Sequence, residues 1–234
     1  MQVFYAPDIS GEYYILDERE SKHTVRVLRM GEGSEIKLID GKGNLFEGII
    51  SDPDQRACKI RILNIIKGFE KRDYNLHIAI SPLKNPERFE WFVEKSVEIG
   101  VDEITPLICH HTEKHGLKTE RLNNIIVSAM KQSLKASVTK LNAACRFSDF
   151  VNSPRPGTLM IAHCSDGGER KGIGEAYLKG SKAVILIGPE GDFSEEEIIR
   201  AVNKGYIPVS LGKSRLRTET AGVVACHSIY FINQ

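Results

Sequence analysis

Two stretches near the C-terminus decide the fold of this chain: Ile185-Leu-Ile-Gly-Pro-Glu-Gly-Asp-Phe-Ser194 and Leu211-Gly-Lys-Ser-Arg-Leu-Arg-Thr-Glu-Thr-Ala221. In each stretch we expect an apolar strand that runs into a glycine turn and then into the start of a helix. Glycine has no Cβ, so a ligand can approach the backbone of such a turn closely. Two such turns from one sheet are typical of the place where α/β folds bind a small ligand.

The residues after the two turns indicate helix starts. Ser194 and Glu197 match a capping box, which predicts a helix over Glu195–Lys204. Thr218 and Thr220 are expected to open an apolar helix that runs to about Ile232. Two ordinary strand–helix loops would also fit, but a cluster of cations favours an anionic partner at the second turn. These cations are Lys213, Arg215 and Arg217.

The composition is that of an ordinary globular protein, with 41% hydrophobic and 27% charged residues in 234. No apolar stretch approaches the ~20 residues that a membrane span needs, and the N-terminus lacks the pattern of a signal peptide. The five cysteines are scattered and form no C-x-x-C pair. We therefore expect reduced thiols and a cytoplasmic location without a membrane partner.

Charge is segregated along the chain, although the formal net charge is only +1. Residues 1–70 hold ten Lys and Arg against twelve Asp and Glu. Residues 113–146 hold seven Lys and Arg against two Asp and Glu. This distribution allows a phosphate-binding face without an extreme isoelectric point.

Residues 1–70 are predicted to form a small β-barrel domain. A short helix capped by Ser21 is expected at Ser21–Leu28, and the turn at Gly41-Lys-Gly-Asn44 predicts a hairpin. The polar break at Lys67–Asp73 marks the domain boundary. The predicted strands of this domain are Glu35–Asp40, Leu45–Ser51 and Ala57–Ile66.

Residues 71–234 alternate between strand and helix patterns, which predicts a mainly parallel sheet with crossover helices. Helices are expected at Pro86–Ile99, where Gly100 is placed as a C-terminal cap, and at Glu120–Lys135. The predicted strands are Tyr74–Ser81, Glu103–Leu107, Thr158–His163 and Ala183–Ile187.

Two other segments contain residues of functional types. Cys109-His-His-Thr-Glu-Lys-His115 could bind a metal, but no second cluster supplies the remaining ligands. We expect a solvated loop there and no metal site. Gly167–Gly174 matches neither the Walker nor the dinucleotide-binding pattern and is expected to be a connector.

Two groups of polar residues could contact an RNA backbone or simply face solvent. The first lies near the end of the predicted helix Glu120–Lys135, where cations are also favoured by the helix dipole. Its members are Lys131, Gln132 and Lys135. The second recurs at a three-residue helical spacing and comprises His23, Arg26 and Arg29.

Five motifs in this order carry a resemblance to a known family. They are His23…Val27-Leu28-Arg29, Lys84…Arg88-Phe-Glu-Trp…Lys95…Glu98-Ile-Gly-Val-Asp-Glu-Ile-Thr-Pro106, Lys131-Gln-Ser133, Gly188-Pro-Glu-Gly191 and Leu211-Gly212…Leu216-Arg-Thr-Glu-Thr220. The chain resembles the ribosomal RNA small subunit methyltransferase E family of the SPOUT superfamily. Asp192 stands where the family's pattern carries a second glycine.

This resemblance implies a PUA-like β-barrel that binds RNA over residues 1–70. It also implies an α/β SPOUT domain with a deep trefoil knot over residues 71–234, and a homodimer. The implied reaction is methyl transfer from S-adenosyl-L-methionine to N3 of uridine 1498 in 16S ribosomal RNA of the small subunit. Two alternatives remain open: a methyltransferase of this fold that acts on another RNA site, and a non-catalytic RNA-binding protein.

The resemblance assigns two sets of binding residues. The cofactor-binding set comprises Leu186, Ile187, Gly188, Pro189, Glu190, Gly191, Leu211, Gly212, Arg215, Leu216, Arg217 and Thr218. The RNA-binding set comprises His23, Arg26, Arg29, Lys84, Arg88, Lys131, Gln132 and Lys135.

The implied chemistry needs a group that stabilises a uracil anion and a group that accepts the N3 proton. A guanidinium can stabilise the anion through preorganised charge, so Arg217 is the candidate for that role. Glu190 is the candidate for proton acceptance. The alternatives are a dimer or phosphate contact for Arg217 and capping of the following helix for Glu190.

Overall fold

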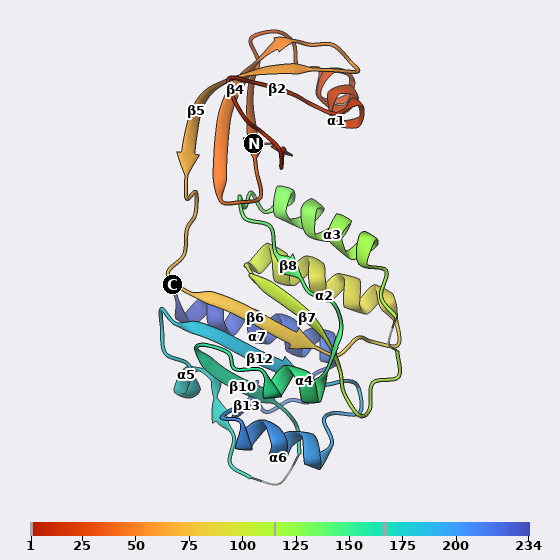
Figure 1. Cartoon of the computed structure of the whole chain (residues 1–234), viewed down its shortest axis with the longest axis vertical. Coiled ribbons are helices and arrows are strands. Elements are labelled where there is room, and N and C mark those ends of the chain that lie inside the picture. Colours follow the sequence, from red (N-terminus) through yellow and green to blue (C-terminus); the bar gives the residue numbers. More distant parts are fainter. Residues whose placement is uncertain (1, 115, 166–167) are drawn as a thin grey trace. The chain divides into compact units, whose positions relative to one another are not determined.

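The computed structural model describes residues 2–114, 116–165 and 168–234 (Figure 1). Two compact units make up the chain. The first comprises the chain up to Lys71 together with Val127–Val138. The second comprises Arg72–Ile126 and Thr139–Gln234.

The first unit is built on a sheet whose outer strands, β1 (Val3–Tyr5) and β2 (Tyr13–Ile15), do not pair with each other. Between them lie β3 (Glu35–Ile39), β4 (Asn44–Asp52) and β5 (Lys59–Lys67), in the order β1-β3-β4-β5-β2. Only the β1–β3 pair is parallel among the described strands of this sheet. The sheet is therefore an open half-barrel. Its hydrophobic core includes the side chains of Phe4, Leu16, Leu38, Ile50 and Ile60.

The helix in this unit begins earlier than the sequence pattern predicts. Helix α1 spans Glu18–Lys22, and the Asp17 side chain caps it by accepting a hydrogen bond from Glu20 N at 2.7 Å. The predicted cap at Ser21 is wrong, because its hydroxyl is buried and donates to Leu16 O while it accepts from Cys58 N. Ser21 thus joins the helix to the sheet instead of starting the helix.

The hairpin between β3 and β4 explains why Val127–Val138 belongs to the first unit. Gly43 N donates to Ala136 O, and Val138 N donates to Gly41 O, each at 2.9 Å. Both glycines have positive φ angles, 73° at Gly41 and 93° at Gly43. Glycine tolerates this backbone conformation, which the turn needs to present its peptide groups to the second segment.

The second unit contains the parallel sheet that strand–helix alternation predicted. Its strands run in the order β11-β13-β10-β12-β6-β7-β8, and β9 pairs beside β8 on β7. All the pairs described in this sheet are parallel. The strands are β6 (Asn75–Ile80), β7 (Glu103–Ile108), β8 (Lys140–Leu141), β9 (Cys145–Arg146), β10 (Thr158–Ala162), β11 (Lys171–Gly172), β12 (Lys182–Ile187) and β13 (Ile207–Ser210).

Helices cover both faces of this sheet (Figure 1). On one face α2 (Pro86–Ile99) packs against α7 (Thr218–Ile232). A Cβ on Gly222 of α7 would lie 2.5 Å from the Phe92 ring, so this helix pair requires a glycine there. The other helices are α3 (Thr119–Gln132), α4 (Phe147–Asn152), α5 (Ile173–Ala176) and α6 (Glu195–Asn203).

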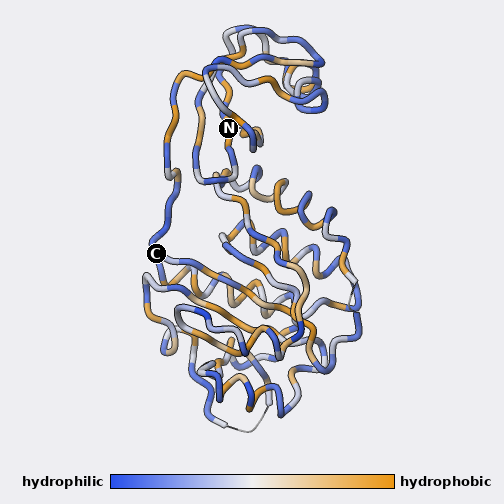
Figure 2. Tube along the Cα trace, viewed as in Figure 1, coloured by the Kyte–Doolittle hydropathy of each residue, from blue (hydrophilic) through white to orange (hydrophobic). Residues whose placement is uncertain are grey.

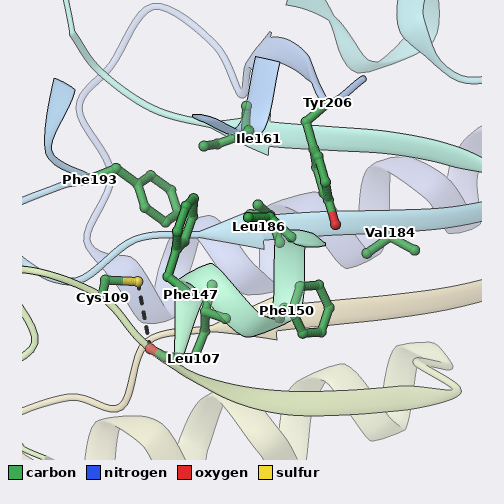
Figure 3. Packing of buried hydrophobic residues seen from close by; sticks show 12 residues of the cluster. Leu107, Cys109, Phe147, Phe150, Ile161, Val184, Leu186, Phe193 and Tyr206 are labelled. Carbon is green, nitrogen blue, oxygen red and sulfur yellow. Dashed lines mark hydrogen bonds between the residues drawn. The ribbon is translucent and has the colours of Figure 1, made fainter. Parts of the chain in front are cut away.

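The opposite face carries a core that joins α4 and α6 to the sheet (Figure 3). Phe147 and Phe150 of α4 pack beside Val184 and Leu186 of β12, and the Cys109 thiol donates to Leu107 O at 3.6 Å. Hydrophobic residues concentrate along the sheet strands (Figure 2). Because β12 is buried on both faces, it is apolar at nearly every position, as expected for a central parallel strand.

The fold class expected from the sequence is confirmed by this parallel sheet and the half-barrel that precedes it. The trefoil knot stays a prediction. Both the capping box at Ser194 and the C-terminal cap at Gly100, which has a φ of 125°, are confirmed. Within the part of the chain that the structure describes, no helix has both the length and the apolar character needed to cross a membrane.

Histidine 77 gives the second unit a predicted sensitivity to acid. Its side chain is buried on β6, and Nε2 lies 2.7 Å from the Thr105 hydroxyl. Burial lowers the pKa of His77, against the opposing charge of Glu103. The pKa of His77 falls to about 4, so between about pH 6.5 and about pH 4 the unfolded chain binds a proton that the folded chain does not. In this window the free energy of unfolding falls by up to about 1.4 kcal/mol per pH unit as the pH falls.

Urea unfolding at several pH values, for the wild type and His77→Leu, measures this effect. The wild type should lose stability more steeply than the variant as the pH falls. Equal slopes for the two proteins would contradict the assignment to His77.

Candidate functional site

A cleft of about 390 Å³ lies where β10, β12 and β13 end. The loops that follow these strands and the first turn of α7 line it. Parallel strands bring their carboxyl ends to the same edge, so the two glycine turns quoted above meet there. Every residue of the predicted cofactor-binding set lines the cleft except Leu186 and Gly191.

Leu186 and Gly191 do not line the cleft, because each contacts another part of the chain. The Leu186 side chain is fully buried in the core with Phe147 and Phe193 (Figure 3). A Cβ on Gly191 would lie 3.2 Å from His111 Cβ, so this glycine allows the turn to pack against the loop after β7.

Gly188 and Gly212 both line the cleft, but glycine is needed at the two positions for different structural reasons. A Cβ on Gly188 would lie 3.1 Å from the Phe193 ring, so Gly188 is needed for contact within the chain. Gly212 has a φ of +126°, a conformation that other residues rarely adopt, and no atom lies within 4 Å of the position of a Cβ. A side chain at Gly212 would therefore project into open space beside the cleft.

Asp192 fixes the first turn to the loop after β10. Its Oδ2 accepts a hydrogen bond from Cys164 N at 2.7 Å, and its Oδ1 accepts from Phe193 N at 2.8 Å. The residue has a φ of +63°, which explains why glycine is an alternative at this position. Asp192 adopts the positive φ itself, and its carboxylate connects the turn after β12 to the loop after β10.

The two candidate catalytic residues have different surroundings. Arg217 precedes α7 as its N-cap residue; it is exposed and lines the cleft. Among the described residues it has no ion-pair partner. Glu190 is also exposed, and its Oε1 accepts a hydrogen bond from Lys84 N at 3.3 Å. Arg217 can therefore reach a ligand directly, whereas the Glu190 carboxylate already has a protein donor.

Two cleft residues, Arg88 and Glu219, form a pair that sequence reasoning missed. Arg88 was predicted to contact RNA, but it lines the cleft, and its Nε lies 3.8 Å from Glu219 Oε1. Glu219 is 7% exposed, and its Oε2 has no hydrogen-bond partner among the described residues. Its place between Thr218 and Thr220 indicated only a helix start, because the contact with α2 is not local in sequence.

His163, which follows β10, was also missed. Its side chain is buried against the cleft, and neither ring nitrogen has a hydrogen-bond partner in the described part of the chain. Burial lowers the pKa of His163. The charge of Asp192 raises this pKa, and the charge of Arg170 lowers it further. The neutral ring can therefore donate to or accept from a ligand. A histidine directly after an apolar strand was the only sequence signal.

The predicted RNA-binding residues of the first unit are only partly brought together. His23, Arg26 and Lys131 line one hollow, where Lys131 Nζ lies 2.7 Å from Glu20 Oε1. The prediction that His23, Arg26 and Arg29 share one face of an α-helix is wrong. His23–Val27 forms a wider π-helical turn, and Arg29 has a φ of +55°. Arg29, Gln132 and Lys135 do not line this hollow.

Lys84, the remaining candidate, is exposed in the second unit and pairs with Glu113 at 3.0 Å. Within residues 2–114, 116–165 and 168–234, no group of three or more His, Cys, Asp or Glu side chains could hold a metal ion. His115 and Gly167, which belong to the two segments weighed above, lie outside the described residues.

Comparisons with known proteins agree with this architecture. Residues 70–230 match the model of an RNA methyltransferase domain, and residues 16–63 match that of an RNA methyltransferase PUA domain. The chain is 29% identical to the ribosomal RNA small subunit methyltransferase E of Buchnera aphidicola, over 92% of this chain and 86% of that protein.

Two solved structures extend the comparison. A probable rRNA-methyltransferase from Porphyromonas gingivalis is 40% identical, with a TM-score of 0.94 over 100% of this chain and 98% of that one. A ribosomal RNA small subunit methyltransferase E from Neisseria gonorrhoeae, solved bound to S-adenosyl methionine, is 26% identical. Its TM-score is 0.83 over 99% of this chain and 97% of that one.

Proposed function

The chain belongs to the RNA methyltransferase family, and we propose on this premise that it methylates N3 of uridine 1498 in 16S ribosomal RNA. The methyl donor is S-adenosyl-L-methionine, which the solved relative from Neisseria gonorrhoeae carries bound. The observation that carries this proposal is the cleft at the ends of β10, β12 and β13. Its location is where an α/β sheet presents backbone groups to a ligand.

The residues of the cleft fit such a cofactor. A cleft of about 390 Å³ suits a small molecule. Its wall is apolar at Ile187, Val209 and Leu216, whereas His163 offers two buried ring nitrogens that lack a partner among the described residues. The cofactor, when bound, supplies a methyl group carried on a positively charged sulfur. The backbone around Gly188 and Gly212 would hold it.

On the RNA side, the Arg217 guanidinium stabilises the negative charge that develops on the uracil ring. It is exposed at the rim of the cleft and carries no protein carboxylate partner in the described chain. A preorganised charge of this kind acts where the transition state gains charge. For the acceptor of the N3 proton the resemblance favours Glu190, which lines the same cleft but already accepts a hydrogen bond from Lys84 N.

In this proposal the first unit, which contains Val127–Val138 beside the N-terminal residues, supplies contacts to the RNA backbone, and the second unit is the catalytic domain. The hollow offers the cations Arg26 and Lys131, and the imidazole of His23, as contacts for phosphates. Arg29, Gln132 and Lys135 of this unit remain proposed contacts, as do Lys84 and the cleft residue Arg88 of the second unit. A ribosomal substrate places the protein in the cytoplasm, within reach of the small subunit.

Mapping of modified nucleosides tests the proposed reaction. In a strain that lacks the gene, 16S ribosomal RNA should lose 3-methyluridine at one position, and the wild-type gene should restore it. Gly212→Val should fail to restore it, because Gly212 lines the cleft and its φ of +126° is a backbone conformation that valine rarely adopts. Full methylation in the deletion strain would contradict the proposal.

Arg217→Ala should slow methyl transfer by about a hundredfold or more, as expected for the loss of a transition-state donor. Cofactor affinity should stay within about threefold. Single-turnover methylation at saturating enzyme and cofactor measures the rate, and calorimetry measures the affinity. Lys213→Ala is the matched control, because Lys213 lies in the same turn but does not line the cleft.

We also propose that the protein forms a homodimer through the outer face of α7. Phe231 is 69% exposed there and stacks on His227, with ring centroids 6.1 Å apart. These side chains border a groove that Ile173 and Leu211 also line. A contiguous exposed apolar surface is typical of a protein association site.

Phe231→Glu should convert the dimer to a monomer, because it places a charge in the apolar contact. Light scattering at micromolar concentration measures the mass. Val202→Glu changes an exposed apolar residue on α6 and should leave the dimer intact. A wild-type protein that is monomeric would refute the dimer.

A further inference from the structure

Glu219 is a buried carboxylate with one ion-pair partner, Arg88, and no hydrogen bond to its Oε2 among the described residues. It lies in the first turn of α7 and lines the cleft, yet it is only 7% exposed. Oε1 lies 3.8 Å from Arg88 Nε, and Oε2 has no partner in the part of the chain that the structure describes. A buried charged oxygen without a donor is costly, so this geometry calls for a donor from a ligand.

Positive charge from two elements faces Glu219 and holds its carboxylate in place. The Arg88 guanidinium, on α2, faces Oε1, and the N-terminal turn of α7 presents the positive end of its dipole. Gly222 lies one turn further along α7 and allows this helix to pack closely on α2. Arg88 is therefore a positioning residue for the carboxylate.

Glu190 lacks this arrangement. It is exposed to water, and its carboxylate accepts a hydrogen bond from Lys84 N. An acceptor already paired with the backbone and surrounded by water gains less from a ligand N–H than a buried free oxygen does.

We propose that Glu219, and not Glu190, accepts the proton from N3 of the target uracil; this inference rests on the proposed function. The N3–H bond breaks, and its proton moves to Glu219 Oε2. The electron pair left on N3 forms the new bond to the methyl carbon. The pair of the breaking carbon–sulfur bond returns to sulfur, which becomes neutral, and Glu219 then releases its proton to water.

The test compares single-turnover rates of the wild type, Glu219→Gln and Glu190→Gln, with 3-methyluridine measured by mass spectrometry. Glu219→Gln should be slower by about a hundredfold or more near neutral pH, the contribution of a general base. Its rate should then rise about tenfold per pH unit, because hydroxide must remove the proton instead. The wild type and Glu190→Gln should both lack this rise, and Glu195→Gln, on the exposed start of α6, should match the wild type.

Calorimetry separates proton acceptance from cofactor binding. Glu219→Gln should bind S-adenosyl-L-methionine and its demethylated product within about threefold of the wild type. A larger loss for either ligand would make Glu219 a cofactor anchor and overturn the inference. A rise of rate with pH in Glu190→Gln alone would overturn it in favour of Glu190. A wild type that makes no 3-methyluridine would refute the proposed function itself, and with it any role for Glu219 at N3.

Discussion

Parallel pairing of β12 with β10, and of β10 with β13, brings the ends of these strands to one edge of the sheet. Every feature of the cleft depends on this pairing, because the loops that line it start at Ala162, Ile187 and Ser210. A shift of one residue in register would also turn Val184 and Leu186 out of the core on the α4 face. The apolar packing of β12 and the position of the cleft are thus set by the same hydrogen bonds.

The turn after β12 shows how the core shapes the cleft. Phe193 packs with Phe147 in the core, and its ring and backbone approach Gly188 so closely that a Cβ would lie 3.1 Å away. Asp192, between the two, holds Cys164 N with its carboxylate. The contacts of Phe193 and Asp192 therefore fix the loop after β12, and a ligand would meet preorganised backbone groups there.

The sequence predicted those features of the fold that depend on residues close together in the chain. Glycine turns, the capping box at Ser194 and the parallel sheet followed from residue type and spacing, and the structure contains them. The cap at Ser21 failed because Asp17 competes for the same helix start, and Ser21 is committed to Cys58. The Arg88–Glu219 pair joins residues far apart in the chain, so no spacing rule could have found it.

The charges of the cleft suit a transfer that begins with a cationic sulfur. In the proposed step, the Glu219 carboxylate takes up the N3 proton beside the positive Arg88 guanidinium. The sulfur and Glu219 would both lose their charge while Arg88 keeps its own, so the net charge inside the cleft would not change. In a site with little water, a step that creates net charge is costly, whereas mutual neutralisation is not. A carboxylate held by a guanidinium at this place therefore matches the demands of methyl transfer to an imide nitrogen.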